Sequence, residues 1–561
     1  MYRTHTCGEL RVADVKKEVK LAGWVHAIRT HGALTFIDIR DRYGVTQVTA
    51  DKQHAEGIAK ESVIQVIGSV FRKDQPNRNL ATGDVEVKAS AVNVLGAARP
   101  LPLDLSNPET TEETRLKYRY LDLRRSRMQK NLLLRHKAVI AVREYFDSLG
   151  FMEIETPILA KSTPEGARDY LVPSRVNPGN FFALPQSPQI FKQLFQVAGL
   201  DRYVQIVKCF RDEDLRADRQ PEFTQIDLEM SFVDEEDVYA TMEGMIRHVW
   251  KKTLDVDIPT PIPRITYKEA MARYGSDKPD LRFDLEITDM TDWARKTDFQ
   301  IFKEAECVRA IKVAGDFSRK QIDKMTDVVK IYGAKGLAWV KRADGANAGG
   351  ISKFFEKEDF GLQDGEYLFF VADIQRVVEP ALGALRLHLG RELGLIRKDE
   401  WNFAWVTEFP LMEWSEERQA YGPMHHPFTS PDLKDRHLLK TAPEKASSRA
   451  YDLTLNGVEL GGGSIRIHDR QLQSEVFDAL KISKEEQERK FGFMLGAFEY
   501  GAPPHGGIAF GLDRLIMLLV GADNIREVIA FPKNKDAQDL MMDSPSEVSA
   551  EQLDELGIRL E

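Results

Sequence analysis

The sequence predicts a multidomain α+β protein that begins with a β-barrel. Over roughly the first 105 residues, five segments alternate apolar and polar side chains between Gly and Asp clusters, as half-buried strands do. Farther along, helical periods mix with β-rich runs that do not alternate strictly, which favours an antiparallel α+β domain over a doubly wound sheet. A chain of 561 residues has room for about three or four domains.

The five strands expected within residues 1–105 fit a small barrel of the oligonucleotide-binding (OB) type, although any other small β-domain fits the pattern about equally well. Residues 106–137 follow as a hinge and a basic linker. Its part from 115 to 137 carries nine Lys or Arg and one acid, interleaved with Tyr118 and Tyr120. That composition is typical of a surface that faces phosphates, and a solvated helix face is the simpler alternative.

The remaining sequence predicts one α+β domain in two parts, residues 138–285 and 400–561. Between them, residues 286–399 have helix and strand signals of their own and form an expected insertion. The total charge of -10 hides a segregation, because the first 137 residues sum to +8 and the remainder to -18. The acidic total therefore does not exclude a nucleic-acid partner.

Composition excludes several classes of protein. An apolar content of 42% is too high for general disorder. Cys7, Cys209 and Cys307 are odd in number and lack a C-x-x-C pair, so we expect neither a disulfide framework nor a structural zinc site. No apolar run reaches the roughly 18 residues that a membrane span needs, and we expect a cytoplasmic protein without a membrane partner.

Three separated motifs bear on function. Residues 150–159 (GFMEIETPIL) predict a helix end and a strand running into a proline, which suits a sheet edge or an interface. Residues 209–227 place Arg211 and Glu213 two apart on an expected strand, with an aromatic residue and an acid on one face of the return strand. Residues 507–519 predict a glycine-rich segment that leads directly into an apolar helix. An arginine fork suits phosphate and an aromatic ring suits a base, but each motif alone has an ordinary structural explanation.

Taken together, the motifs resemble motifs 1, 2 and 3 of the class II aminoacyl-tRNA synthetases in order and spacing. A barrel preceding such a catalytic domain is similar to the subgroup for Asp, Asn and Lys, and most of all to its bacterial aspartate-specific branch. Further strings that look like this family lie at 163–175, 183–194, 274–282, 424–431, 457–468 and 503–514. The resemblance covers essentially the whole chain and implies an OB-fold barrel, a class II catalytic domain built on an antiparallel sheet and an inserted α+β domain.

The resemblance implies a reaction in two steps. An aspartate carboxylate attacks the α-phosphorus of ATP to give an adenylate and diphosphate, and the terminal ribose of the tRNA then takes the aspartyl group. No protein nucleophile is needed, so catalysis rests on positioning and charge stabilisation. The implied ligands are L-aspartate, ATP, Mg²⁺ and tRNA-Asp, with charging of tRNA-Asn left open, and the implied assembly is a homodimer.

The resemblance also implies roles for individual residues. The catalytic residues are Arg211, Glu459 and Arg514. ATP is bound by Arg211, Asp212, Glu213, Gln220, Phe223, Glu459, Gly511, Leu512, Asp513 and Arg514. Aspartate is bound by Glu165, Ser187, Gln189, Lys192, Arg211, Asp227, His425, His426 and Arg466, with Lys192 and Arg466 as cations for its side chain and the two histidines adding charge when protonated. Magnesium is held by Asp452 and Glu459, and a lid is expected around Gly166.

For the barrel, the resemblance implies that unstacked anticodon bases are bound on its surface. Phe36 is the expected stacking platform, and Arg29, Gln47 and Glu86 are expected to contact base edges. His31 lies in the loop that influences whether tRNA-Asn is charged. Without the resemblance, a strand Phe would be placed in the core.

Other functions stay open on the sequence alone. An asparaginyl- or lysyl-tRNA synthetase of the same subgroup would share every motif, although a lysine enzyme would replace Arg466 by an acid. A non-catalytic RNA-binding paralogue would be expected to lack one of the catalytic residues, all of which are present. An amino-acid ligase that acts without tRNA would have no use for the barrel.

Overall fold

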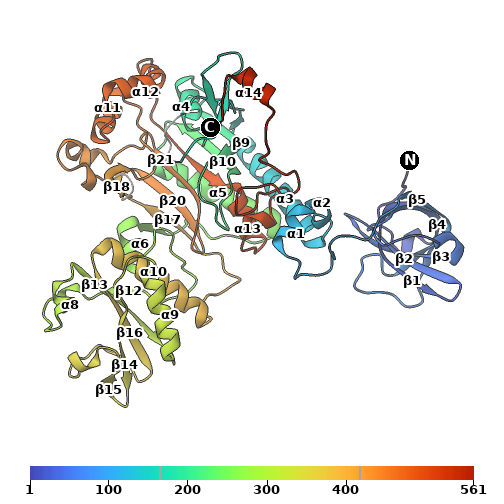
Figure 1. Cartoon of the computed structure of the whole chain (residues 1–561), viewed down its shortest axis with the longest axis horizontal. Helices are drawn as coiled ribbons and strands as arrows, with labels where there is room; N and C mark the ends of the chain where they lie inside the picture. The colour runs from blue at the N-terminus through green and yellow to red at the C-terminus, as the bar shows by residue number, and fades with distance from the viewer. Residues whose placement is uncertain (163–166, 416–418, 561) are drawn as a thin grey trace. The chain divides into compact units, whose positions relative to one another are not determined.

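The computed structural model describes residues 1–162, 167–415 and 419–560 (Figure 1). The chain forms two compact units. The first comprises Met1–Lys130 with Asp539–Ser544, and the second comprises Asn131–Gln538 with Pro545–Glu561. Within the described ranges, no helix combines the length and the apolar character that crossing a membrane requires.

The first unit contains a closed five-stranded barrel, which confirms the predicted OB-type fold. Its strands, in barrel order, are β1 (Glu18–His31), β2 (Leu34–Asp41), β3 (Gly44–Asp51), β5 (Val85–Gly96) and β4 (Val63–Arg72). Alternation decides which side chains enter the core. On β2, Ile37 and Ile39 are fully buried, whereas Phe36 and Asp38 at the alternate positions are only partly buried and belong to the outer face.

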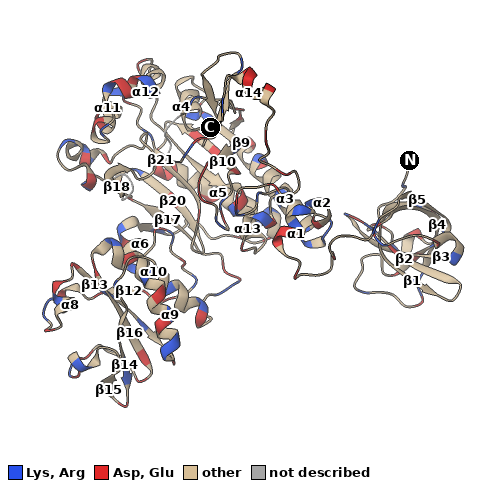
Figure 2. Cartoon of the chain, in the orientation of Figure 1, with Lys and Arg blue, Asp and Glu red and all other residues tan. Residues whose placement is uncertain are grey.

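The basic segment after the barrel folds into short helices, α1 (Glu112–Lys117) and α2 (Arg119–Asp122), and opens the long helix α3 (Ser126–Ser148). Figure 2 shows the Lys and Arg residues of these helices in blue. Its single acid, Asp122, is fully buried and pairs with three arginines of the segment, Arg115, Arg119 and Arg125. Arg124 pairs with Glu61 of the barrel at 3.0 Å. The expectation of a phosphate-facing run is therefore wrong for these four cations, because folding already pairs them.

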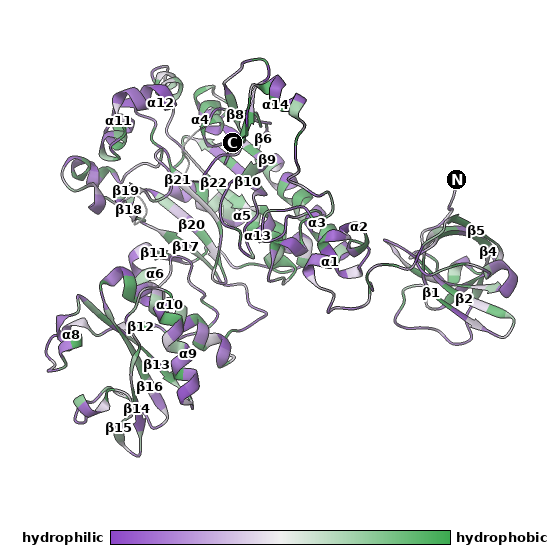
Figure 3. Ribbon diagram, viewed as in Figure 1, coloured by the Kyte–Doolittle hydropathy of each residue, from purple (hydrophilic) through white to green (hydrophobic). Residues whose placement is uncertain are grey.

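An eight-stranded sheet forms the centre of the second unit. Its order is β11 (Arg264–Thr266), β17 (Phe403–Thr407), β20 (Ala450–Leu455), β21 (Val458–Ile465), β22 (His505–Gly511), β10 (Glu222–Ser231), β9 (Arg202–Phe210) and β6 (Met152–Glu153). Only the two edge pairings, β11 with β17 and β6 with β9, are parallel. One face packs on α5 (Glu235–Leu254) and α13 (Leu512–Leu519), where Figure 3 shows hydrophobic residues concentrated. The other face lies opposite this core.

The inserted segment has a five-stranded sheet of its own. Its order is β12 (Ile287–Asp289), β13 (Cys307–Ala314), β16 (Glu366–Asp373), β14 (Ala338–Ala343) and β15 (Ala346–Ala348). Helices α9 (Arg319–Lys330) and α10 (Gln375–Glu392) complete an apolar core with it. The remaining helices and strands are α4 (Gln189–Val197), α6 (Tyr267–Tyr274), α7 (Thr291–Ala294), α8 (Gln300–Glu304), α11 (Arg470–Ala479), α12 (Lys484–Phe498), α14 (Ala550–Leu556), β7 (Leu171–Pro173), β8 (Phe181–Ala183), β18 (Met412–Ser415) and β19 (Ala420–Pro423).

Candidate active site

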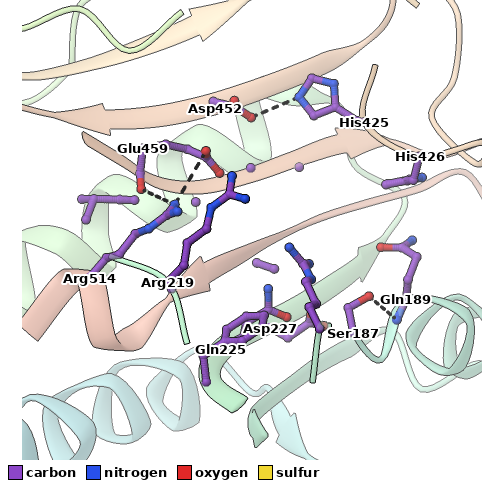
Figure 4. Close-up of a pocket in the computed structure, with 18 of the residues that line it drawn as sticks. Ser187, Gln189, Arg219, Gln225, Asp227, His425, His426, Asp452, Glu459 and Arg514 are labelled. Carbon is purple, nitrogen blue, oxygen red and sulfur yellow. Dashed lines mark hydrogen bonds and ion pairs between the residues drawn. The ribbon is translucent and has the colours of Figure 1, made fainter. Parts of the chain in front are cut away.

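The face of the large sheet opposite its apolar core lines a cavity of about 440 Å³ (Figure 4). Strand β10 shows how the sequence builds it. Ile226 and Leu228 turn into the core, so Gln225 and Asp227 on the alternate positions turn to the cavity. The sequence-derived residues that line it are Ser187, Gln189, Lys192, Arg211, Glu213, Gln220, Phe223, Asp227, His425, His426, Asp452, Glu459, Arg466, Gly511, Asp513 and Arg514.

Two expected site residues that the structure describes, Leu512 and Asp212, are not among those that line the cavity. Leu512 is 1% exposed and belongs to the apolar core, so its assignment to ATP is wrong for its side chain. Asp212 lies outside the cavity lining, with its carboxylate 3.6 Å from Arg168. Glu165 and Gly166, with the centre of the expected lid, lie outside the described residues.

Four buried charges lie together at one end of the cavity. Lys192 Nζ is 3.1 Å from Asp227 and 3.3 Å from Glu229. Arg466 donates to both oxygens of Glu229, from Nε at 2.9 Å and Nη2 at 3.2 Å. All four side chains are at most 1% exposed. Two fixed cations next to a cavity suit an anionic ligand, and the two acids keep the cluster neutral without one.

The sequence interpretation missed Glu229, although the pattern contained it. Glu229 follows Asp227 by two positions on β10 and therefore shares its face. Burial alone would raise the pKa of Glu229, but Arg466 and Lys192 hold it below its ordinary value. Burial raises the pKa of Asp227 from 3.8 to about 6, against the opposing effect of Lys192. The Oδ1 atom of Asp227 is buried and accepts no hydrogen bond from the described residues. It can therefore accept a hydrogen bond from the ammonium of a ligand.

Lys192 and Arg466 differ in how many of their N–H groups already have partners among the described residues. The three N–H groups of Lys192 face Asp227, Glu229 and the carbonyl of Leu228. Arg466 uses four of its five N–H groups, two on Glu229 and two from Nη1 on His426 Nε2 and Ser464 Oγ. Among the described residues, Arg466 thus keeps one donor for a ligand, whereas Lys192 contributes its charge through partners it already holds.

The paired histidines differ in their charge. Burial and the neighbouring Arg466 lower the pKa of His426 well below its ordinary value, so His426 stays neutral and the expected second positive charge is wrong. Burial would also lower the pKa of His425, but Asp452, 3.3 Å away, raises it above the ordinary value. Only His425 of this pair can therefore become charged near neutral pH.

The other end of the cavity combines an aromatic ring with arginines. The guanidinium of Arg211 lies 5.1 Å from the ring centre of Phe223. Arg514 donates to the backbone carbonyl of Glu459 at 3.2 Å and pairs with Asp218. Figure 4 shows Arg219 and Arg514 directed to the same part of the cavity. A ring face with cations beside it suits a nucleotide, whose base stacks and whose phosphates pair.

The structure corrects three local expectations. Arg211 and Glu213 follow β9 in a loop and are not strand neighbours, and Glu213 pairs with Arg219, which the sequence interpretation had missed. Gln220 exchanges hydrogen bonds with the backbone of Lys533. The carboxylate of Asp513 accepts from the amide of Thr224 and from Arg135. Gln220 and Asp513 therefore border the cavity with polar atoms that mainly hold its walls together.

Asp452 and Glu459 stand on the β20 and β21 hairpin and face each other across Gly462. A Cβ atom at Gly462 would lie 2.5 Å from Asp452 Oδ1 and 3.9 Å from Glu459 Oε1, so both carboxylates reach the space that glycine leaves open. Across the described ranges, no three His, Cys, Asp or Glu residues are placed to hold a metal ion together. Two carboxylates fit Mg²⁺, which takes one or two protein oxygens and completes its shell with water and substrate phosphates.

A second candidate surface lies on the outside of the barrel. Phe36 pairs in register with Arg29 on β1 and with Thr49 on β3, so it stands among polar neighbours instead of in the core. Gln47 donates to Glu86 at 2.9 Å on the same surface. His31 ends β1 and is exposed next to a turn at Gly32. Arg29 is 60% exposed and pairs with Asp38, which leaves most of its donors to solvent.

Comparisons with known proteins agree with this architecture. Residues 111–535 match the family model for tRNA synthetases class II (D, K and N), and residues 19–95 match the OB-fold nucleic acid binding domain. The chain is 53% identical over 582 residues to an aspartate-tRNA(Asp/Asn) ligase of Desulfotalea psychrophila, covering 99% of this chain and 96% of the relative. A ligase of the same name from Symbiobacterium thermophilum is 53% identical over the full length of both chains.

Among solved structures, asparaginyl-tRNA synthetase from Pyrococcus horikoshii has a TM-score of 0.62 at 19% identity and covers 95% of this chain and 98% of its own. Aspartyl-tRNA synthetase from Entamoeba histolytica has a TM-score of 0.59 at 20% identity and covers 94% and 90%. At these identities the solved structures support the fold, and the family follows from the full-length relatives and the matching model. The chain belongs to the class II aminoacyl-tRNA ligases of the Asp, Lys and Asn group.

Proposed function

We propose that this ligase activates L-aspartate with ATP and transfers it to tRNA-Asp, and that it also charges tRNA-Asn. Full-length relatives at 51 to 53% identity that are named aspartate-tRNA(Asp/Asn) ligase support both parts. The exposed His31 at the β1 turn is consistent with a relaxed choice between the two tRNAs.

The observation that carries the amino-acid assignment is the buried cation pair, Lys192 and Arg466, at one end of the cavity. Arg466 offers one N–H to a substrate carboxylate, and Lys192 adds a fixed positive charge behind it. Aspartate gains ionic hydrogen bonds here, whereas asparagine offers a neutral amide and lysine an ammonium that two cations repel. Asp227 Oδ1, which accepts no hydrogen bond from the part of the chain that the structure describes, suits the ammonium of the substrate.

ATP binding follows from the opposite end of the cavity. Phe223 supplies a surface for adenine, Arg211 a fork for the α-phosphate and Arg514 a second cation for the outer phosphates. Asp452 and Glu459 would hold Mg²⁺, which adds positive charge on the phosphates when it is bound. With both ligands in one cavity, Arg211 would bind the reacting carboxylate and the α-phosphate together, so positioning would supply much of the catalysis.

The finer parts of the proposal are the anticodon surface, the assembly and the compartment. Phe36 would stack on an unpaired base, with Arg29, His31, Gln47 and Glu86 around it. A homodimer is supported by exposed apolar side chains on α3, on β6 and in the segment after β6, namely Leu133, Ile140, Met152, Ile158 and Leu159. The three free, buried cysteines agree with a reducing compartment such as the cytoplasm.

Two assays test the function. In ATP-diphosphate exchange, aspartate should support activity and asparagine and lysine should not, and a preference for asparagine would overturn the amino-acid assignment. Aminoacylation of purified tRNA-Asp and tRNA-Asn side by side should charge both. Charging of tRNA-Asp alone would limit the function to one tRNA. The proposed assembly is tested separately, because sedimentation of the purified chain should give the mass of a dimer.

A further inference from the structure

A buried row of side chains leads away from the amino-acid end of the cavity. On α4, polar residues recur at Gln189, Lys192, Gln193 and Gln196, the spacing that puts them on one helix face. That face is the buried one, since all four side chains are at most 5% exposed. From Gln189 the row continues through Gln193 to His505 at the start of β22, which is fully buried as well.

The direction of each hydrogen bond in this row follows from its far end. His505 Nδ1 lies 2.8 Å from the carbonyl oxygen of Pro503. A carbonyl can only accept, so Nδ1 carries the proton and Nε2 of the neutral ring is left as an acceptor. Burial lowers the pKa of His505, which keeps the ring neutral. The nearest amide atom, Gln193 Nε2 at 3.2 Å, must then donate to Nε2.

The orientation of His505 also fixes the orientations of the Gln193 and Gln189 amides, which lie between it and the cavity. Once the amide nitrogen of Gln193 faces His505, its oxygen faces Gln189, where it accepts from Nε2 at 3.0 Å. The amide oxygen of Gln189 is then left for the cavity, and no described residue donates to it. Figure 4 shows the oxygen end of this side chain turned to the cavity.

We infer that His505, acting through Gln193, is a positioning residue that fixes the amide of Gln189 with its oxygen toward the substrate. Through three hydrogen bonds, the row relates the acceptor oxygen of the Pro503 carbonyl to an acceptor oxygen of Gln189 in the amino-acid pocket. An ammonium needs acceptors, and an amide free to rotate would offer it a repelling N–H in part of its population. His505 and Gln193 thereby contribute to recognition of the substrate ammonium without touching the substrate.

This inference deepens the proposed function, because it concerns the ammonium of the activated amino acid. It does not depend on which amino acid that is, since every candidate carries the same α-ammonium. If the enzyme activates asparagine in place of aspartate, the proposed specificity fails and the row can be tested with asparagine instead.

The central experiment is a double-mutant cycle in ATP-diphosphate exchange. Gln193→Leu should raise the KM for the amino acid about tenfold, the effect of losing one buried hydrogen-bonded position, while the KM for ATP stays unchanged. In a Gln189→Ala background, Gln193→Leu should cause no further rise, because its target is gone. An equal rise in both backgrounds, or a parallel rise in the KM for ATP, would overturn the inference in favour of a general packing role.

Two further variants keep the test independent of folding. Gln196→Leu removes another buried amide from α4, one that accepts from Ser231 and donates to the backbone carbonyl of Lys192 but does not contact Gln189, and should leave the KM for the amino acid near the wild-type value. His505→Gln restores an acceptor where His505→Leu supplies none, so only the leucine variant should match Gln193→Leu. The unfolding temperature of both His505 variants should first be shown to equal that of the wild type. An equal rise in the KM for the amino acid in these two variants would then contradict a role for hydrogen-bond direction.

Discussion

Asp227→Asn should make the protein more stable and less active. Asp227 is fully buried, and its pKa rises from 3.8 to about 6 on folding because burial penalises the ionised form more than Lys192 favours it. At about 1.4 kcal/mol per pKa unit, holding this carboxylate ionised costs about 3 kcal/mol above pH 6. Asparagine resembles the protonated acid and avoids that cost. The variant should therefore gain about 3 kcal/mol in the free energy of unfolding at pH 7.5.

The pH dependence gives the sign of this effect. For an acid whose pKa is raised in the folded state, the contribution to stability is greatest below the unfolded pKa of 3.8 and is lost as the pH rises through about 6. The advantage of the variant should accordingly fall to about half at pH 5. Urea unfolding followed by tryptophan fluorescence measures it, because Trp250 and Trp405 lie in the core beneath the same sheet.

Glu229→Gln is the matched control on the same strand face. Its pKa is held below the ordinary value, so its ionised form stabilises the fold and its neutralisation should destabilise it. In exchange assays Asp227→Asn should lower kcat/KM for aspartate by about a hundredfold or more, since an ionic acceptor for the ammonium is lost. An Asp227→Asn protein that is less stable than wild type at pH 7.5 would refute the reasoning, because pairing with Lys192 would then outweigh burial.

Three further predictions concern other parts of the molecule. Arg466→Leu should abolish aspartate-dependent exchange while ATP binding, measured by calorimetry, survives; normal activation would mean that the carboxylate is bound elsewhere. Phe36→Ala should raise the KM for tRNA in aminoacylation about tenfold and leave ATP-diphosphate exchange unchanged, as expected for loss of one stacked base, and an unaltered KM would remove Phe36 from the anticodon surface. Gly462→Ala, whose Cβ would lie 2.5 Å from Asp452 Oδ1, should raise the Mg²⁺ concentration for half-maximal exchange several-fold, whereas Gly496→Ala, which meets no atom within 4 Å, should not.

The local alternation of apolar and polar residues predicted much of the fold. The barrel strands were predictable because alternation marks one face as the core, as on β2, and β10 was predictable because polar and apolar residues alternate from Gln225 to Ser231. The residue type alone would have placed Phe36 in the core, but Ile37 and Ile39 take the inner positions and leave Phe36 on the outer face. The charge of the basic segment was misleading for the opposite reason, because its one acid, Asp122, sits within seven residues of three arginines and is buried with them.

The amino-acid pocket shows what sequence spacing does not contain. Glu229 meets Lys192 and Arg466 only through tertiary structure, at sequence separations of 37 and 237 residues. Its burial follows from those partners, because an acid on a strand face is otherwise solvated. Family resemblance named both cations as ligands, but only the geometry separates Arg466, which keeps one N–H without a partner among the described residues, from Lys192, whose ammonium already faces Asp227, Glu229 and the Leu228 carbonyl.

The two buried acids make physical sense in a pocket proposed for an acid. Two cations buried without partners would strongly destabilise the fold. Cations on side chains that are not held in place would also turn toward any polar ligand. Pairing with Asp227 and Glu229 fixes Lys192 and Arg466 in place and leaves one directed N–H and one directed carboxylate oxygen facing the cavity. A ligand then gains most when it presents an anion and an ammonium at the separation that these two atoms set. Selectivity in such a pocket rests on fixed directions more than on net charge, which is why neutralising Asp227 should strengthen the fold and weaken the enzyme together.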